Sequence, residues 1–145
     1  MTVTVEVLSE VTSEAVEAFG RLLPQLSASA EPLDAAALDA VATAQASTVL
    51  MARTADGRIA GTLTLVMFRI PTGQRARIED VVVDAAARRQ GIAEALTQEA
   101  LRLAREAGVK NVDLTSRPSR EAAGRLYQRL GFGQRDSRIF RYTFS

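Results

Sequence analysis

The segment Arg77–Leu96, RIEDVVVDAAARRQGIAEAL, decides the fold of this chain. Its first half contains the β-branched run VVVD and predicts a strand, whereas apolar residues after Gly91 recur at helical spacing and predict a helix. The N-terminus of a helix carries unpaired N–H groups and a partial positive charge, so anions bind there. Gly91, which follows Arg88 and Arg89, is therefore a candidate contact for a phosphate group.

Three phosphate-binding patterns can be compared with this turn. A nucleotide P-loop would end in Gly-Lys-Ser/Thr, and a dinucleotide-binding turn would need three spaced glycines, and neither is present. The pattern Arg/Gln-x-x-Gly-x-Gly/Ala is matched by Arg88, Gly91 and Ala93. This pattern is short, and an ordinary helix start is the alternative interpretation.

The elements around this turn predict one α/β (α+β) domain over residues 1–145. Their order is β-α-α-β-β-β-α-β-α-β-β, so we expect a mixed sheet with helices on its faces. We expect strands over residues 2–8, 76–83, 111–116, 132–136 and 137–144, two strands within 47–70, and helices over 13–26, 31–46, 91–107 and 119–131.

Caps and turns set the expected boundaries of these elements. Ser13 and Ser119 are expected to cap helices, and Pro32 is expected in the first turn of its helix. Asp56-Gly57 predicts a two-residue hairpin turn in which both residues have positive φ. Gly131 is expected to end the last helix.

Composition excludes several kinds of chemistry. The chain of 145 residues contains no cysteine and no histidine. A disulfide framework, a thiolate zinc site, a cysteine nucleophile and a histidine base are therefore excluded, and no metal is expected. The chain has no apolar run long enough to cross a membrane, and its first residues do not form a signal peptide, so we expect a cytoplasmic protein.

Charge is distributed unevenly along the chain. Residues 1–50 hold seven acids and one arginine, whereas residues 51–145 hold ten acids and seventeen bases. The basic half could receive a phosphorylated ligand, or it could be ordinary solvated surface. Interleaved aromatics, a helix-turn-helix pattern and a high pI are all missing, so no nucleic-acid partner is expected.

A second motif, AAGRLYQRLGF, covers Ala122–Phe132. Together with the turn at Gly91, it resembles the GNAT superfamily of N-acetyltransferases, whose members carry R-x-x-G-x-G/A at a helix start and a later Leu-Tyr pair followed by Gly-Phe. The strand RIEDVVVD also looks like that of glucosamine-phosphate acetyltransferases. Two positions depart from the family pattern: Ala93 replaces the second glycine, and Arg120 stands where many members have asparagine near the cofactor.

The resemblance implies a fold and a cosubstrate. It implies a mixed, mostly antiparallel central sheet of six to seven strands with helices on both faces, and acetyl-CoA as acetyl donor. The pantetheine arm would lie along Val81, Val82 and Val83 like an added strand, between strands that splay apart over 78–83 and 112–115. A backbone N–H near Val82 would polarise the thioester carbonyl. The pyrophosphate site would comprise Arg88, Arg89, Gln90, Gly91, Ile92 and Ala93.

The resemblance also implies direct attack of an amine on the thioester, without an acyl-enzyme. Glu79 is the candidate base, with Asp80 or a water molecule as alternatives, and strand alternation puts the two carboxylates on opposite faces. Glu79 could instead be a surface carboxylate paired with Arg77. Tyr127 is the candidate acid that protonates the leaving thiolate, and a packing role beside Leu126 and Leu130 is its alternative.

The expected function is that of an N-acetyltransferase acting on a primary amine of a small molecule or peptide. The acidic N-terminal third, including Glu31, Asp34 and Asp39, would attract a cationic acceptor. The alternative is a non-catalytic acyl-CoA-binding regulatory module of the same fold. No membrane partner is expected, and the edge-like segment RIFRYTF, Arg138–Phe144, suggests a homodimer.

Overall fold

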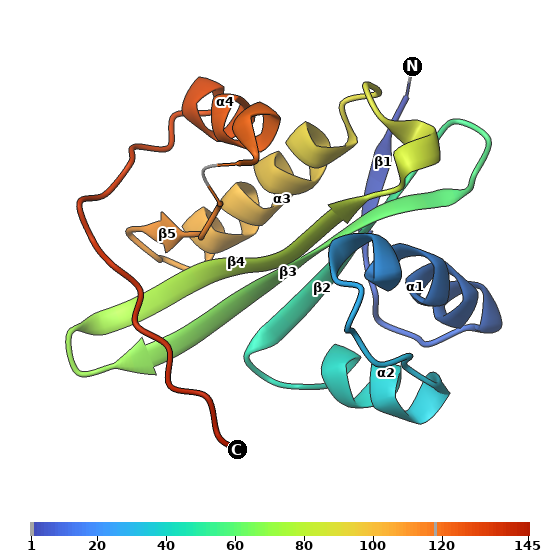
Figure 1. Ribbon diagram of the computed structural model, residues 1–145, viewed down its shortest axis with the longest axis horizontal. Helices are drawn as coiled ribbons and strands as arrows, with labels where there is room; N and C mark the ends of the chain where they lie inside the picture. The colour runs from blue at the N-terminus through green and yellow to red at the C-terminus, as the bar shows by residue number, and fades with distance from the viewer. Residues whose placement is uncertain (1, 118) are drawn as a thin grey trace. The chain divides into compact units, whose positions relative to one another are not determined.

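The first compact unit of the protein is built on one mixed β-sheet (Figure 1). The computed structural model describes residues 2–117 and 119–145, which divide into the units Met1–Thr115 and Ser116–Ser145. The sheet has five strands in the order β1-β2-β3-β4-β5. The first three pairs are antiparallel and β4–β5 is parallel. The strands are β1 (Thr4–Val7), β2 (Ser47–Arg53), β3 (Ile59–Ile70), β4 (Gly73–Val83) and β5 (Val112–Asp113).

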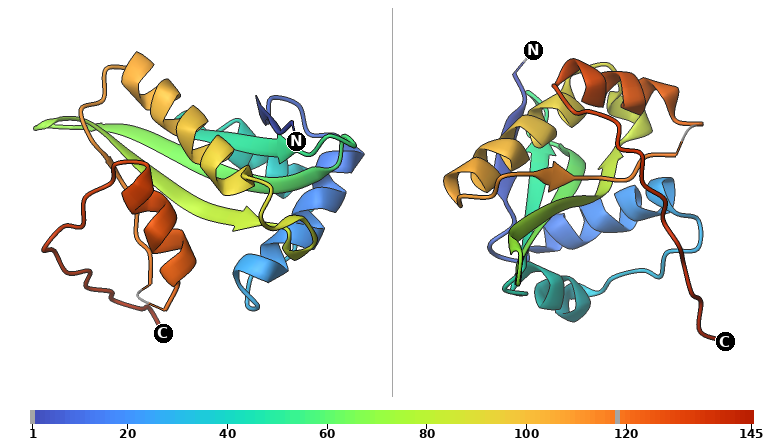
Figure 2. Two further views of the ribbon diagram at one scale, coloured as in Figure 1. Left: turned by 90° about the horizontal axis from the view of Figure 1, so that it is seen from above. Right: turned by 90° about the vertical axis from the view of Figure 1, so that its left-hand side faces the viewer.

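Helices cover both faces of this sheet. Helices α1 (Ser13–Leu26) and α2 (Ala35–Ala42) lie on one face, and α3 (Ile92–Glu106) lies on the other (Figure 2). The middle of β2, VLMA, is buried on every residue, as expected for a strand covered on both sides. Alternate residues of the sheet thus supply two cores.

Each core combines one helical face with alternate strand residues. On the α1 side, Phe19 and Leu22 pack in one cluster with Val49, Met51 and Val82. Apolar burial of this kind is the main contribution to the stability of the fold.

The α3 side depends on a close approach between helix and sheet. A Cβ added to Gly61 would lie 2.7 Å from Ile92 Cγ2 and 3.3 Å from Leu96 Cδ1. Gly61 in β3 therefore lets the first turns of α3 sit directly on the sheet.

The second unit contains helix α4 (Glu121–Arg129) followed by an extended tail. The two closing strands expected over 132–136 and 137–144 are not formed, so the sheet has five strands instead of six to seven. Alternating apolar residues are not sufficient for a strand, because its backbone must also form hydrogen bonds with a neighbouring strand. Within Ser116–Ser145 no described segment forms a strand.

Several boundaries also differ from those expected. Thr12 and not Ser13 caps α1, and Asp34 caps α2, which leaves Pro32 outside that helix. Both cap side chains accept a backbone N–H, at 3.1 Å from Ala15 and 2.8 Å from Ala37. The order of the four helices and the presence of a hairpin within residues 47–70 agree with the sequence prediction.

The hairpin loop and the N-cap of α4 also differ from those expected. The hairpin loop spans residues 54–58, and Gly57 has φ 85° while Asp56 is not in the positive region. The loop is longer than two residues, so one glycine suffices. Arg120 and not Ser119 is the N-cap of α4, and its side chain makes no capping hydrogen bond. Among the described residues, no helix is long and apolar enough to cross a membrane.

Candidate active site

The turn between β4 and α3 has an unusual backbone. After β4 the chain passes through Asp84 and a short 3-10 helix, η1 (Ala85–Ala87), before α3 begins. Arg89 has φ 66°, and Gly91, the N-cap of α3, has φ 75° and ψ 19°. Gly91 has no side chain with which to cap the first-turn N–H groups of α3. The turn therefore presents backbone donors at the positive end of a 15-residue helix.

The side chains of the turn divide into exposed cations and packed residues. Arg88 and Arg89 are exposed, Gln90 and Ala93 are half-buried, and Ile92 is buried against the sheet. A Cβ at Gly91 would meet no atom within 4 Å, so the space in front of this residue is open. Backbone donors, open space and two arginines fit an anionic group such as a pyrophosphate.

One edge of β4 is unpaired beside this turn. The pairing of β4 with β5 covers only Ala76–Val112 and Arg77–Asp113. Within the described part of the first unit, no strand adjoins residues 78–83 on that side. Val81 and Val83 are half-buried and Val82 is buried. Such an edge can accept an extended ligand by backbone hydrogen bonding.

A β-bulge lies in the middle of this edge. Thr64 pairs with Glu79 and Thr62 pairs with Val82, so β4 has one residue more than β3 across this interval. Asp80, with φ 51°, is in the left-handed region there. The bulge interrupts the simple alternation expected for residues 79–82 and disturbs the ladder next to Val82.

Glu79 has a cationic neighbour. Its carboxylate Oε2 lies 3.7 Å from Arg77 Nε, and its side chain is 50% exposed. Arg77 Nη2 also donates to Thr115 Oγ1 at 3.1 Å. The ion pair with Arg77 that the sequence left open is therefore present, and the exposed carboxylate is accessible to a ligand. Asp80 is exposed on the bulge.

Tyr127 lies in the second unit of the chain. The residue is half-buried on α4, and its ring meets Phe132 edge-on at a centroid distance of 5.6 Å. Burial raises the pKa of the Tyr127 hydroxyl above its usual value, and the charge of Arg120 opposes this shift. The group therefore holds its proton at neutral pH.

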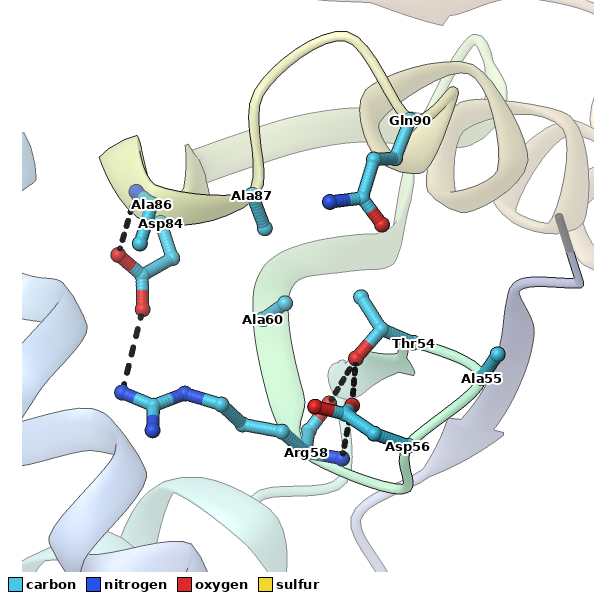
Figure 3. A pocket seen from close by; sticks show the side chains of 9 residues that line it. All are labelled: Thr54, Ala55, Asp56, Arg58, Ala60, Asp84, Ala86, Ala87 and Gln90. Atoms are coloured by element: carbon cyan, nitrogen blue, oxygen red, sulfur yellow. Dashed lines mark hydrogen bonds and ion pairs between the residues drawn. The ribbon is translucent and has the colours of Figure 1, made fainter.

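A pocket lies beside the turn, on the side of the β2–β3 loop (Figure 3). It has a volume of about 330 Å3. Sequence patterns did not indicate this pocket or the contacts of α1 with Asp84 described below, because both join segments distant in the chain. Its lining residues are Thr54, Ala55, Asp56, Arg58, Ala60, Asp84, Ala86, Ala87 and Gln90.

The sequence model of the acetyltransferase (GNAT) family matches residues 10–132. No curated protein sequence matches the chain.

Solved structures resemble the whole chain. An acetyltransferase from Trypanosoma brucei is 25% identical, with 99% of this chain and 100% of that chain covered and a TM-score of 0.79. A transcriptional regulator from Bacillus halodurans is 26% identical over 99% and 100%, with a TM-score of 0.78. An aminoglycoside acetyltransferase from an uncultured soil metagenomic sample is 25% identical over 100% of both chains, with a TM-score of 0.80.

Proposed function

The chain belongs to the GNAT acetyltransferase family, and on this premise we propose that it transfers an acetyl group from acetyl-CoA directly to a primary amine of a small molecule or peptide. Acetyl transfer from acetyl-CoA is the general reaction of this family. The observation that carries the proposal is the unpaired edge of β4, which leads into the uncapped, glycine-started N-terminus of α3.

The donor would lie along this edge and end on the turn. The pyrophosphate would accept hydrogen bonds from backbone N–H groups between Arg89 and Ala93, with Arg88 and Arg89 supplying charge. The pantetheine arm would follow residues 81–83. The bulge supports a role for the backbone near Val82 in polarising the thioester carbonyl, because a disturbed ladder can release an N–H for a ligand.

The acceptor must lose a proton before or during its attack. We assign this task to Glu79, directly or through water, because its carboxylate is half-exposed on the strand that would carry the thioester. Asp80 is the neighbouring alternative. Glu79→Gln should lower kcat/KM by about 10²-fold or more, and Asp80→Asn is the matched control. Equal effects of the two substitutions would contradict the assignment to Glu79.

Tyr127 is proposed as the acid that protonates the CoA thiolate as it leaves. Its hydroxyl holds its proton at neutral pH, as an acid must, and burial that raises its pKa keeps it in that state. Tyr127→Phe keeps the ring and its contact with Phe132 and removes only the hydroxyl. We expect kcat to fall by about 10²-fold with little change in acetyl-CoA binding. Full turnover by this variant would reject the acid role.

Thiol release from acetyl-CoA across a panel of amines tests the function as a whole. The panel contains aminoglycosides, because a similar structure is an aminoglycoside acetyltransferase, and also amino-sugar phosphates, polyamines, amino acids and peptides. The chain has no cysteine, so it contributes no thiol background. Thiol release with one class of amine, matched by the acetylated product, is the expected result.

A non-catalytic acyl-CoA-binding module is the second candidate. The similarity to a transcriptional regulator favours it, since that protein has the same fold at comparable identity. Acetyl-CoA binding without turnover on any amine of the panel would favour this candidate over the enzyme.

We propose that both units form one acetyltransferase domain, because the family match runs across their boundary from residue 10 to 132. We also propose a homodimer that uses the tail, in which Ile139, Phe140, Tyr142 and Phe144 are 67% to 91% exposed.

A further inference from the structure

Asp84 is a buried carboxylate at the start of the β4–α3 turn. Its side chain is only 7% exposed. Its Oδ1 accepts the N–H of Ala86 at 3.0 Å and so caps η1. A buried carboxylate is stable only when its oxygens are fully satisfied. The contacts that satisfy Asp84 therefore bear on the shape of the turn.

Helix α1 supplies most of these contacts from about 60 residues earlier in the sequence. Arg21 Nη1 donates to Asp84 Oδ2 at 2.6 Å, and its Nη2 donates to the carbonyl of Ile59 at 3.2 Å. Gln25 Nε2 donates to Asp84 Oδ1 at 3.4 Å, and Gln25 Oε1 accepts the N–H of Ala85 at 2.8 Å. We call Arg21, Gln25 and Asp84 the α1 clasp.

The two flanks of the turn differ in their support. On the α1 side, Arg21 holds the side chain of Asp84, and Gln25 holds the backbone of Ala85. On the other side lies the pocket of about 330 Å3, which Ala86, Ala87 and Gln90 help to line (Figure 3). Arg58 approaches Asp84 across this side at 3.8 Å, but its side chain is 55% exposed. Packing alone therefore leaves the turn room to move.

A backbone anion site depends on fixed geometry, because its donors must already point at the ligand. We propose that Arg21 and Gln25 are positioning residues for acetyl-CoA, and that they preset the turn at residues 84–91 by holding Asp84 and Ala85. This inference rests on the proposed function. It gives α1 a direct part in donor affinity.

Calorimetric titration of the full chain with acetyl-CoA tests the α1 clasp. Arg21→Met, Gln25→Leu and Asp84→Asn should each weaken binding by about tenfold. The double variant Arg21→Met/Asp84→Asn should be little weaker than either single variant, because both remove the same contact. In a turnover assay, KM for acetyl-CoA should rise while the acceptor KM stays constant.

Two control variants separate positioning from general stability. Glu17→Gln removes another partner of Arg21, but Glu17 is 65% exposed and does not contact the turn, so binding should stay within about twofold. Val16→Ala thins the core beneath α1 and should lower the melting temperature without changing the affinity. A clasp variant that loses affinity only in proportion to its melting temperature would overturn the inference.

The outcomes for donor binding and for the α1 clasp are distinct. Failure of the unaltered protein to bind acetyl-CoA would overturn the proposed function and the inference with it. Binding by the unaltered protein with unchanged affinity in the clasp variants would overturn the inference alone. Gln25→Leu keeps the test decisive if Asp84→Asn fails to fold, because Gln25 lies at the exposed end of α1.

Discussion

Gly91 and Gly20 differ in backbone conformation, so the two glycines are expected to respond in opposite ways to substitution by alanine. Gly91 has φ 75°, which disfavours any other residue, whereas Gly20 lies exposed inside α1, where an added Cβ would meet no atom within 4 Å. The backbone conformation and not the available space therefore decides what an alanine would do at each site.

We expect Gly91→Ala to destabilise the protein by about 1 kcal/mol and to weaken acetyl-CoA binding. Gly20→Ala should instead stabilise it by about 0.5–1 kcal/mol, because alanine has the higher helix propensity. Urea unfolding of the two variants measures both changes. The same sign for both substitutions would contradict this explanation.

Sequence and structure diverge most clearly at individual residues of β4 and of the turn that follows it. Gly91 was recognisable because a glycine between a strand and a helix is a strong local signal. The bulge at Asp80 and the positive φ of Arg89 carry no such signal, since neither residue type requires that conformation. The contacts of Arg21 and Gln25 with the turn were equally hidden, because only tertiary structure brings α1 there.

Among elements, the packing of α3 on the sheet depends on Gly61. A side chain at this position would meet Ile92 Cγ2 at 2.7 Å and the carbonyl of Val82 at 3.2 Å. Gly61→Ala should therefore destabilise the protein by about 1–3 kcal/mol and displace the start of α3. Thermal unfolding measures the first effect and acetyl-CoA titration measures the second.

The control for this substitution is Gly133→Ala, which meets no atom within 4 Å. It should change stability by less than about 0.5 kcal/mol. Adding Ile92→Leu to Gly61→Ala removes the nearest methyl branch and should recover part of the loss. No difference between the Gly61 and Gly133 variants would show that α3 does not need the close approach.

Strands were predicted correctly where the residue pattern was clear and the partner strand lay next to it in the sequence. The 47–70 hairpin was predictable because its two strands are adjacent and joined by a loop containing Asp56-Gly57. The tail after Gly131 has a similar apolar alternation but forms no strand in the described residues. Periodicity reports which residues would share a face, and it does not report whether a neighbouring strand is there to pair with.

For the whole molecule, acid stability follows from carboxylates that are paired in the folded state. The backbone N–H of Ala86, followed by Gln25 and Arg21, lowers the pKa of Asp84. Arg102 lowers that of Glu99 through a side-chain hydrogen bond. A folded-state pKa below the unfolded value adds stability above the unfolded pKa, and this stability is lost as pH falls through the folded pKa.

The free energy of unfolding should therefore be constant between about pH 7 and 5 and should decline below about pH 4. Urea titrations at several pH values measure this decline. Asp84→Asn should flatten it, because asparagine does not titrate in this range. A decline of the same steepness in that variant would assign acid sensitivity to other carboxylates.

Self-association is a second property of the whole molecule. Phe140 and Tyr142 are 91% and 81% exposed, which is unfavourable for aromatic rings in water. Phe140→Ser/Tyr142→Ser should convert a dimer to a monomer in size-exclusion chromatography with light scattering. Val41→Ser, at a 36% exposed position on α2, should leave the dimer intact. A monomeric unaltered protein would refute the proposed dimer.

The unpaired edge of β4 also bears on which mutations the donor site can tolerate. A ligand held by peptide groups is recognised through the main chain, so the half-buried side chains of Val81 and Val83 can vary as long as they favour an extended backbone, whereas Val82 packs in the core below α1 and must stay apolar. Proline is the exception, because it has no N–H to donate. Random substitution at positions 81 and 83 should therefore yield many active variants, and proline should be absent among them.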